Sequence, residues 1–156
     1  MEYEELKAVQ TLPGRERFAK GPVAVIECVQ EIPCNPCEAA CKFGAIKIGE
    51  PITNLPVLAE DKCTGCGICA SACPGLAIFV VNKAYSMETA TVAFPHEYFP
   101  VPEKGAAVRA VNRKGEYVCD GVVRKVQNPG SFDHTPVVTI EIPKDMADEV
   151  RGIQRG

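Results

Sequence analysis

Long apolar runs are missing from this sequence, and no segment approaches the length that a membrane-spanning helix requires. The first residues, Met-Glu-Tyr-Glu-Glu, lack the basic and apolar regions of a secretory leader, so we expect a cytoplasmic protein. Nucleic acid is disfavoured as a partner, because the net charge is −3 and no cluster of Lys and Arg stands out. A glycine fingerprint for nucleotides is also absent, since Gly14 and Gly21 are isolated. The composition, with 46% hydrophobic and 24% charged residues, is typical of a globular protein.

Cysteine, by contrast, is abundant, and four of the nine cysteines follow the order Cys63-x2-Cys66-x2-Cys69-x3-Cys73-Pro74. This spacing is that of bacterial 4Fe–4S motifs, in which the first three thiolates bind one cluster and the fourth serves another. The glycines at positions 65 and 67 suit a loop that passes close to a cluster. A zinc site is disfavoured, because such sites usually use two separated C-x2-C pairs. A disulfide framework is disfavoured as well, because nothing marks the chain as secreted.

A second cysteine motif lies upstream, in the order Cys28-x5-Cys34-x2-Cys37-x3-Cys41. Its last three cysteines repeat the end of the downstream motif, but its first gap is wider, and Lys42 stands where a proline would be expected. Eight motif cysteines suffice for two 4Fe–4S clusters. An alternative makes Cys28 a buried thiol, which would leave a three-thiolate site suited to a 3Fe–4S cluster.

The two motifs together resemble those of bacterial two-cluster ferredoxins, whose two halves exchange their fourth ligand. The resemblance implies two ligand sets, which we call cluster A and cluster B. Cluster A would be held by Cys28, Cys34, Cys37 and Cys73. Cluster B would be held by Cys63, Cys66, Cys69 and Cys41.

Strand and turn signals divide the chain into three parts with an α+β fold. Residues 1–20 are a polar arm, or a frayed end. Residues 21–82 form a ferredoxin-like two-cluster domain of two half-repeats, with short strands at 23–26, 45–48, 56–59 and 76–81. Residues 83–156 form a small β-rich docking domain that could close as a barrel. We expect strands there at 91–94, 106–111, 117–126 and 137–142, a hairpin turn at 112–115 and a helix over 144–151.

Other candidate functional side chains have simpler interpretations. Cys119 has no cysteine at ligand spacing, so we expect a strand residue and not a ligand. His96 and His134 lie on Pro-flanked segments and are interpreted as surface histidines. Five basic residues are interleaved with acids and are interpreted as a solvated hairpin face: Arg109, Arg113, Lys114, Arg124 and Lys125.

Charge is unevenly distributed along the chain. Residues 21–82 contain six Asp or Glu and three Lys. Two oxidised 4Fe–4S clusters, each with a 2+ core and four thiolates, would bring this segment to roughly −7. Such a segment would favour a partner with a positive surface, or would serve solubility alone.

Clusters bound by four cysteines leave no open position for a substrate, so the sequence predicts a one-electron carrier and not an enzyme in its own right. The spacing C-x3-C-x2-C of radical-generating enzymes is absent. The full length also resembles the iron–sulfur subunits of flavin-dependent amino-acid dehydrogenase complexes of the proline, hydroxyproline or sarcosine type. The resemblance is carried by residues 27–41, 73–81, 94–100 and 148–152.

That second resemblance implies an electron relay between flavoprotein subunits, in a hetero-oligomer where FAD or FMN is bound by the partners and not by this chain. Two alternatives stay open. The chain could be a free ferredoxin that serves several oxidoreductases. It could also be a structural or assembly module of an iron–sulfur complex.

Overall fold

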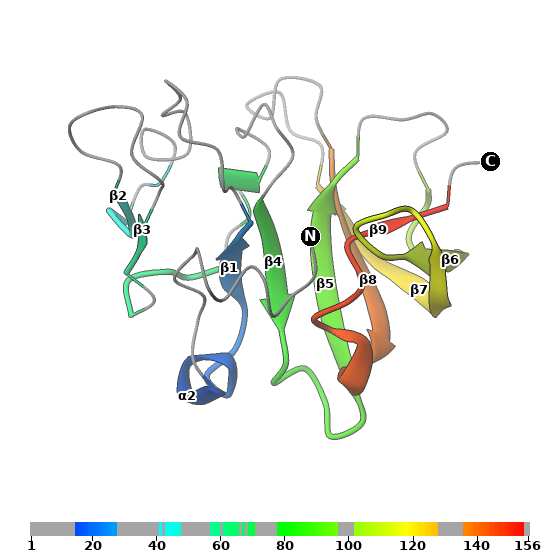
Figure 1. Ribbon diagram of the computed structural model, residues 1–156, viewed down its shortest axis with the longest axis horizontal. Helices are drawn as coiled ribbons and strands as arrows, with labels where there is room; N and C mark the ends of the chain where they lie inside the picture. The colour runs from blue at the N-terminus through cyan, green and yellow to red at the C-terminus, as the bar shows by residue number, and fades with distance from the viewer. Residues whose placement is uncertain are drawn as a thin grey trace.

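The computed structural model describes residues 15–27, 41, 43–47, 57–59, 61–65, 67, 69–70, 78–96, 102–127 and 136–154. Within this part of the chain, seven strands form one antiparallel sheet in the order β1-β4-β5-β8-β7-β6-β9 (Figure 1). A separate pair is formed by β2 and β3. The strands are β1 (Val23–Ile26), β2 (Ile46–Lys47), β3 (Val57–Leu58), β4 (Ile78–Asn82), β5 (Thr89–Pro95), β6 (Ala107–Val111), β7 (Tyr117–Gln127), β8 (Val137–Pro143) and β9 (Gly152–Ile153).

The centre of the sheet is buried because its strands are short apolar runs without alternation. All four residues of β1 are buried, and so are the first four of β4. Such runs, bounded by turn signals, are typical of strands that pack on both faces. The largest fully buried side chains are Phe94, Ile26, Ile46, Ile78, Ile140 and Ile142, followed by valines. The core therefore follows β1, β4, β5 and β8.

The ferredoxin-like part has the strand pairing that two related halves require. The outer strands of the two halves pair, with Val23 opposite Val81. The inner strands also pair, with Ile46 opposite Leu58. Both pairings are antiparallel, so each half contributes one strand to each pair. The four predicted strands are confirmed here, although β2 and β3 are shorter than expected.

The predicted barrel in residues 83–156 is wrong, because the described strands form an open sheet with β1 and β9 at its ends. The physical reason lies at β5. One edge of β5 pairs with β8, and the other pairs with β4 of the ferredoxin-like part, where Val92 lies opposite Val81. Because both edges of β5 are occupied, it has none left with which to close a barrel. The sheet is continuous across residue 82, and the division into two domains there stays a prediction.

The predicted helix over 144–151 is wrong as well, since only one 3₁₀ turn, η2 (Lys144–Met146), is present. The chain has to return to the β6 edge immediately afterwards. There the N–H of Arg151 donates to the carbonyl of Val111 at 2.9 Å, and β9 pairs with β6. Val150 is completely buried on this path. Gly152 and Ile153 therefore pair with β6 as an edge strand, and the chain before them does not continue as a helix to Arg151.

Two further predictions concern the turn between β6 and β7 and the N-terminal arm. The hairpin turn at 112–115 is confirmed: Gly115 has φ +83°, and the side-chain oxygen of Asn112 accepts from the N–H groups of Lys114 and Glu116. The described end of the predicted arm is a short helix, α2 (Arg15–Phe18), and Phe18 is buried in the core. Residues 1–14 lie outside the described residues.

Candidate iron–sulfur site

A pocket between the β1–β4 pair and the β2–β3 pair brings together cysteines from both motifs. It is lined by Cys41 of the upstream motif and by Cys63 and Cys69 of the downstream motif. The rest of the lining is mostly apolar and comprises Ala24, Phe43, Ala45, Ile46, Leu58, Thr64, Gly65, Gly67 and Val80. All three cysteines belong to the set predicted for cluster B. The fourth predicted ligand, Cys66, lies outside the described residues.

Backbone N–H groups point at two of these sulfur atoms. The N–H of Ala24, in β1, donates to Sγ of Cys63 at 3.3 Å. The N–H of Ala45 donates to Sγ of Cys41 at 3.4 Å. Hydrogen bonds of this kind stabilise thiolate ligands and help to set the potential of an iron–sulfur cluster. The donor set and its apolar surroundings therefore fit a 4Fe–4S cluster.

The cysteine loop approaches β1 so closely that position 65 must be glycine. Gly65 has φ +74°, in the left-handed region. A Cβ atom placed there would lie 2.5 Å from Cβ of Pro22 and 2.8 Å from the Pro22 carbonyl carbon and oxygen. The loop is therefore pressed against the residue that precedes β1. The close neighbour of Gly65 is therefore Pro22, and the approach of this loop to a cluster stays a prediction.

Arg17 connects this loop to α2, and sequence reasoning missed it. Its guanidinium donates to the carbonyl of Gly21 at 3.2 Å, of Pro22 at 2.8 Å and of Cys63 at 2.7 Å. Arg17 is only 8% exposed. It fixes the loop at the first cysteine of the downstream motif and places a positive charge beside it. A single arginine in a polar segment carries no signal that would have revealed this role.

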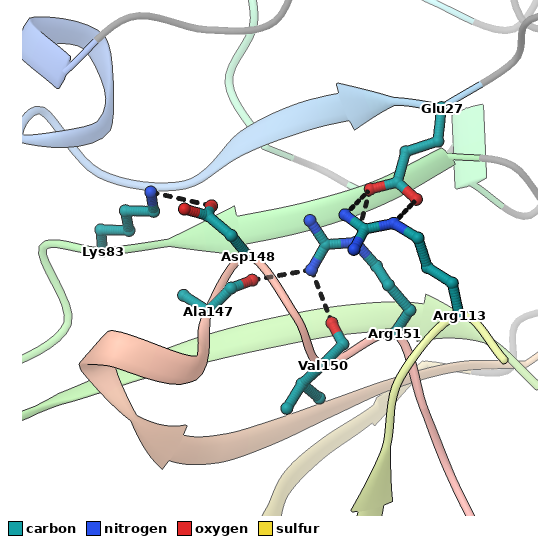
Figure 2. A network of polar contacts seen from close by, with 7 residues as sticks. All are labelled: Glu27, Lys83, Arg113, Ala147, Asp148, Val150 and Arg151. Carbon is teal, nitrogen blue, oxygen red and sulfur yellow. Dashed lines mark hydrogen bonds and ion pairs between the residues drawn. The ribbon is translucent and has the colours of Figure 1, made fainter. Parts of the chain in front are cut away.

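The cysteines predicted for cluster A, namely Cys28, Cys34, Cys37 and Cys73, all lie outside the described residues. Glu27, which directly precedes Cys28, is described and accepts from two arginines (Figure 2). Arg113 donates through Nε to Oε1 at 2.8 Å and through Nη2 to Oε2 at 2.7 Å. Arg151 donates through Nε to Oε2 at 2.6 Å. The end of β1 is thus tied to the C-terminal third of the chain.

Arg113 corrects the interpretation of the basic cluster as a solvated face. The Arg113 side chain is 12% exposed, because it turns inward to Glu27. The other four members are exposed; Arg124 pairs with Glu141 at 2.7 Å, and the guanidinium of Arg109 lies 4.5 Å from the centre of the Tyr117 ring. The interpretation therefore holds for four of the five residues.

Arg151 is the most deeply buried charge in the described part of the chain. Its Nη1 donates to the carbonyls of Ala147 at 2.7 Å and Val150 at 2.6 Å, while its Nη2 is buried without a hydrogen-bond partner. Burial lowers the pKa of the Arg151 guanidinium, and the carboxylate of Glu27 opposes that shift. Sequence reasoning placed Arg151 at the end of a helix, whereas it connects the C-terminal turn to the neighbour of Cys28.

Cys119 and His96 complete the comparison with the sequence predictions. Cys119 is confirmed as a residue of β7, where it lies opposite Ala110, and burial raises the pKa of its thiol. The prediction of a surface histidine is wrong for His96, which is 5% exposed and contacts Phe94 edge to face. His134 lies outside the described residues.

No three Cys, His, Asp or Glu side chains among the described residues converge on a site for one metal ion. In a 4Fe–4S cluster each thiolate binds a different iron, so its ligands need to share only a pocket. In the same part of the chain, no helix has the length and apolar character needed to cross a membrane.

Comparisons with known proteins also identify iron–sulfur binding in the segment that contains the downstream motif. Residues 56–79 match the family described as "4Fe-4S binding domain". An uncharacterized ferredoxin of Methanocaldococcus jannaschii is 32% identical over 83 residues, which is 52% of this chain and 51% of that protein. A second uncharacterized ferredoxin of that organism is 46% identical over 78 residues, 45% of each chain. The polyferredoxin-like subunit of the aliphatic sulfonate oxidoreductase of Pyrococcus furiosus is 46% identical over 48 residues, 31% of this chain and 27% of that one.

These alignments span about half of the two archaeal ferredoxins and about a quarter of the Pyrococcus subunit. No solved structure matches the chain significantly. The matched family covers the downstream motif, from Cys63 to Cys73. The chain thus contains a ferredoxin-like 4Fe–4S binding domain, and its relatives support a role in iron–sulfur electron transfer.

Proposed function

We propose that this chain is the one-electron relay subunit of a flavoprotein complex that oxidises an amino acid. It would bind two 4Fe–4S clusters through the ligand sets of cluster A and cluster B, and partner subunits would bind FAD or FMN. The observation that carries the proposal is the pocket shared by Cys41, Cys63 and Cys69. It joins the two cysteine motifs at one site, as exchange of the fourth ligand requires.

The residues of the pocket have separable tasks. A 4Fe–4S cluster, when bound, takes up and releases one electron at a time. Cys41, Cys63 and Cys69 hold it, and the N–H groups of Ala24 and Ala45 stabilise the negative sulfur atoms. Apolar side chains from β2, β3 and β4 exclude water from the inner wall, which adjusts the reduction potential. None of these groups is placed to act on an organic substrate, so the chain is an electron carrier and not an enzyme on its own.

The exposed fraction of Phe43 supports transfer to a partner. Phe43 lines the same pocket and is 49% exposed, so an aromatic side chain extends from the cluster B site to the surface. A docked flavoprotein could therefore approach this pocket closely. We propose that cluster B exchanges electrons on this side and that cluster A serves the opposite partner. The cysteine thiolates fit a reducing compartment such as the cytoplasm.

Membership of a complex is supported by the Pyrococcus relative, whose name describes an oxidoreductase subunit. The amino-acid substrate class rests on the resemblance of residues 27–41, 73–81, 94–100 and 148–152. The two archaeal relatives, which are named ferredoxins, favour a second candidate: a free ferredoxin that serves several enzymes.

The test is native, anaerobic purification followed by reduction with proline, hydroxyproline or sarcosine. We expect flavin to co-purify with the chain, and we expect the clusters to reduce and reoxidise as fast as turnover. Cys63→Ser should interrupt transfer, whereas the matched variant Cys119→Ser should not. Clusters that stay oxidised during turnover would contradict the relay. A chain that purifies without flavoprotein and accepts electrons from several reductases would support the free ferredoxin.

A further inference from the structure

Arg17 is a buried positive charge beside the pocket of cluster B. It belongs to α2, which lies next to the start of β1 (Figure 1). The following residue, Phe18, packs in the hydrophobic core, so α2 is held against the sheet. Arg17 itself is 8% exposed. Its guanidinium is therefore enclosed by protein at a position that the fold determines.

The guanidinium of Arg17 bridges the two segments that meet at the pocket. Its Nη2 donates to the carbonyl of Pro22 at 2.8 Å and to the carbonyl of Cys63 at 2.7 Å. The same two segments are joined again at Ala24, whose N–H donates to Sγ of Cys63 at 3.3 Å. Cys63 is thus held at its carbonyl by a charged side chain and at its sulfur by a backbone donor.

The charge of Arg17 lies within electrostatic range of a ligand sulfur. A short chain of covalent bonds separates the Cys63 carbonyl oxygen from Sγ of the same residue, so Nη2 is at most roughly 9 Å from that sulfur. Salt screens buried charges much less than surface charges. Cys63 shares the described pocket with Cys41 and Cys69. A cluster bound through these sulfur atoms is therefore in range of the charge.

A buried guanidinium is a costly way to anchor a loop. Taking its charge out of water costs free energy, which a neutral donor to the same carbonyls would largely avoid. A negative group nearby offsets that cost. A 2+ cluster core with four thiolates has a charge of about −2, and reduction brings it to about −3. The attraction between the cluster and Arg17 therefore increases when the cluster takes up an electron.

We propose that Arg17 is a positioning residue that raises the reduction potential of cluster B. It holds Cys63 in place, and its charge stabilises the reduced form of the cluster more than the oxidised form. The sign of this effect follows from the charge of Arg17 itself, so other charges around the site do not reverse it. The inference rests on the proposed binding of cluster B, and it requires neither cluster A nor a flavoprotein partner.

The experiment is an anaerobic redox titration of the full chain, followed by EPR. Arg17→Gln keeps donors for the carbonyls and removes the charge, so the midpoint potential of cluster B should become more negative. For a separation of about 10 Å within protein, the equilibrium constant for reduction should fall on the order of tenfold. Arg17→Lys keeps the charge and should stay close to the wild type. Arg124→Met, in the exposed pair with Glu141, is the matched control and should leave the potential unchanged.

The sign of the shift separates an electrostatic role from a purely structural one. A loosened loop would admit water, which stabilises the more negative, reduced cluster and makes the potential more positive. A potential in Arg17→Gln that equals or exceeds that of Arg17→Lys would therefore overturn the inference.

Two further variants keep the experiment decisive. If Arg17→Gln does not bind cluster B, Arg17→Met takes its place, because it is also neutral and keeps an apolar stem. Loss of cluster B from both neutral variants would show that Arg17 is needed for binding, and would also overturn the inference. The EPR signal that is lost in Cys63→Ser identifies cluster B. If Cys63→Ser keeps all its iron, the proposed cluster B is itself wrong, whatever the result at Arg17.

Discussion

Replacing Gly65 by alanine tests whether the close approach of the cysteine loop to β1 holds the candidate site together. The new Cβ would meet Pro22 at 2.5 to 2.8 Å, including its carbonyl carbon and oxygen. Backbone cannot move aside as a flexible side chain can, so the loop would have to shift away from β1. That shift would strain the hydrogen bond from Ala24 to Cys63 and the one from Arg17 to the Cys63 carbonyl.

The expected magnitude has two parts that can be separated. An alanine at positive φ costs about 1–2 kcal/mol. Overpacking in a fixed environment typically costs about 1–3 kcal/mol more. Gly115→Ala measures the cost of positive φ without overpacking, because Gly115 has φ +83° and nothing lies within 4 Å of the added Cβ.

The assay is iron and sulfide per chain after anaerobic purification, together with the urea midpoint of the loaded protein. We expect Gly65→Ala to lose about half of its iron and roughly 2–5 kcal/mol of stability. Gly115→Ala, which lies outside the pocket lining, should keep its iron and lose about 1–2 kcal/mol. If Gly65→Ala keeps its iron and unfolds at the same urea concentration as Gly115→Ala, the reasoning about this contact is refuted.

Three further predictions concern individual cysteines. Cys28→Ser should damage one cluster only; unchanged iron and EPR signals would show that the upstream site uses another ligand. Cys119→Ser should keep its iron and its visible absorption, because Cys119 is a strand residue away from the pocket, and a loss of half the iron would overturn that assignment. Burial raises the pKa of the Cys119 thiol, so its alkylation in the loaded protein should accelerate only above the pH at which an ordinary thiol ionises. A rate that levels off near neutral pH would contradict this.

Local patterns allowed most of the strands to be predicted. The runs 23–26 and 137–142 are short, apolar and β-branched, and they became β1 and β8 with nearly the expected bounds. The hairpin at Gly115 was predictable because positive φ has a strong residue preference. The resemblance of the cysteine motifs to those of two-cluster ferredoxins predicted that cysteines of both motifs meet, and Cys41, Cys63 and Cys69 do line one pocket.

Long-range pairing could not be predicted in the same way. No local signal says that β4 will occupy the free edge of β5, and that pairing is what keeps the sheet open. The bond from Arg17 to Cys63 spans 46 residues, and the bond from Arg151 to Glu27 spans 124. Charged residues are usually exposed, so neither arginine had a feature that marked it as buried. The sequence therefore predicted which cysteines meet in the pocket better than the buried charges near it.

The most direct test of the central claim is the count of iron and acid-labile sulfide in the anaerobically purified chain. Two 4Fe–4S clusters predict about eight of each per chain, with Cys119 as the one motif-independent thiol open to alkylation in the loaded protein. About four of each, with the thiols of Cys28, Cys34 and Cys37 also open to alkylation, would show a single cluster and would contradict the relay.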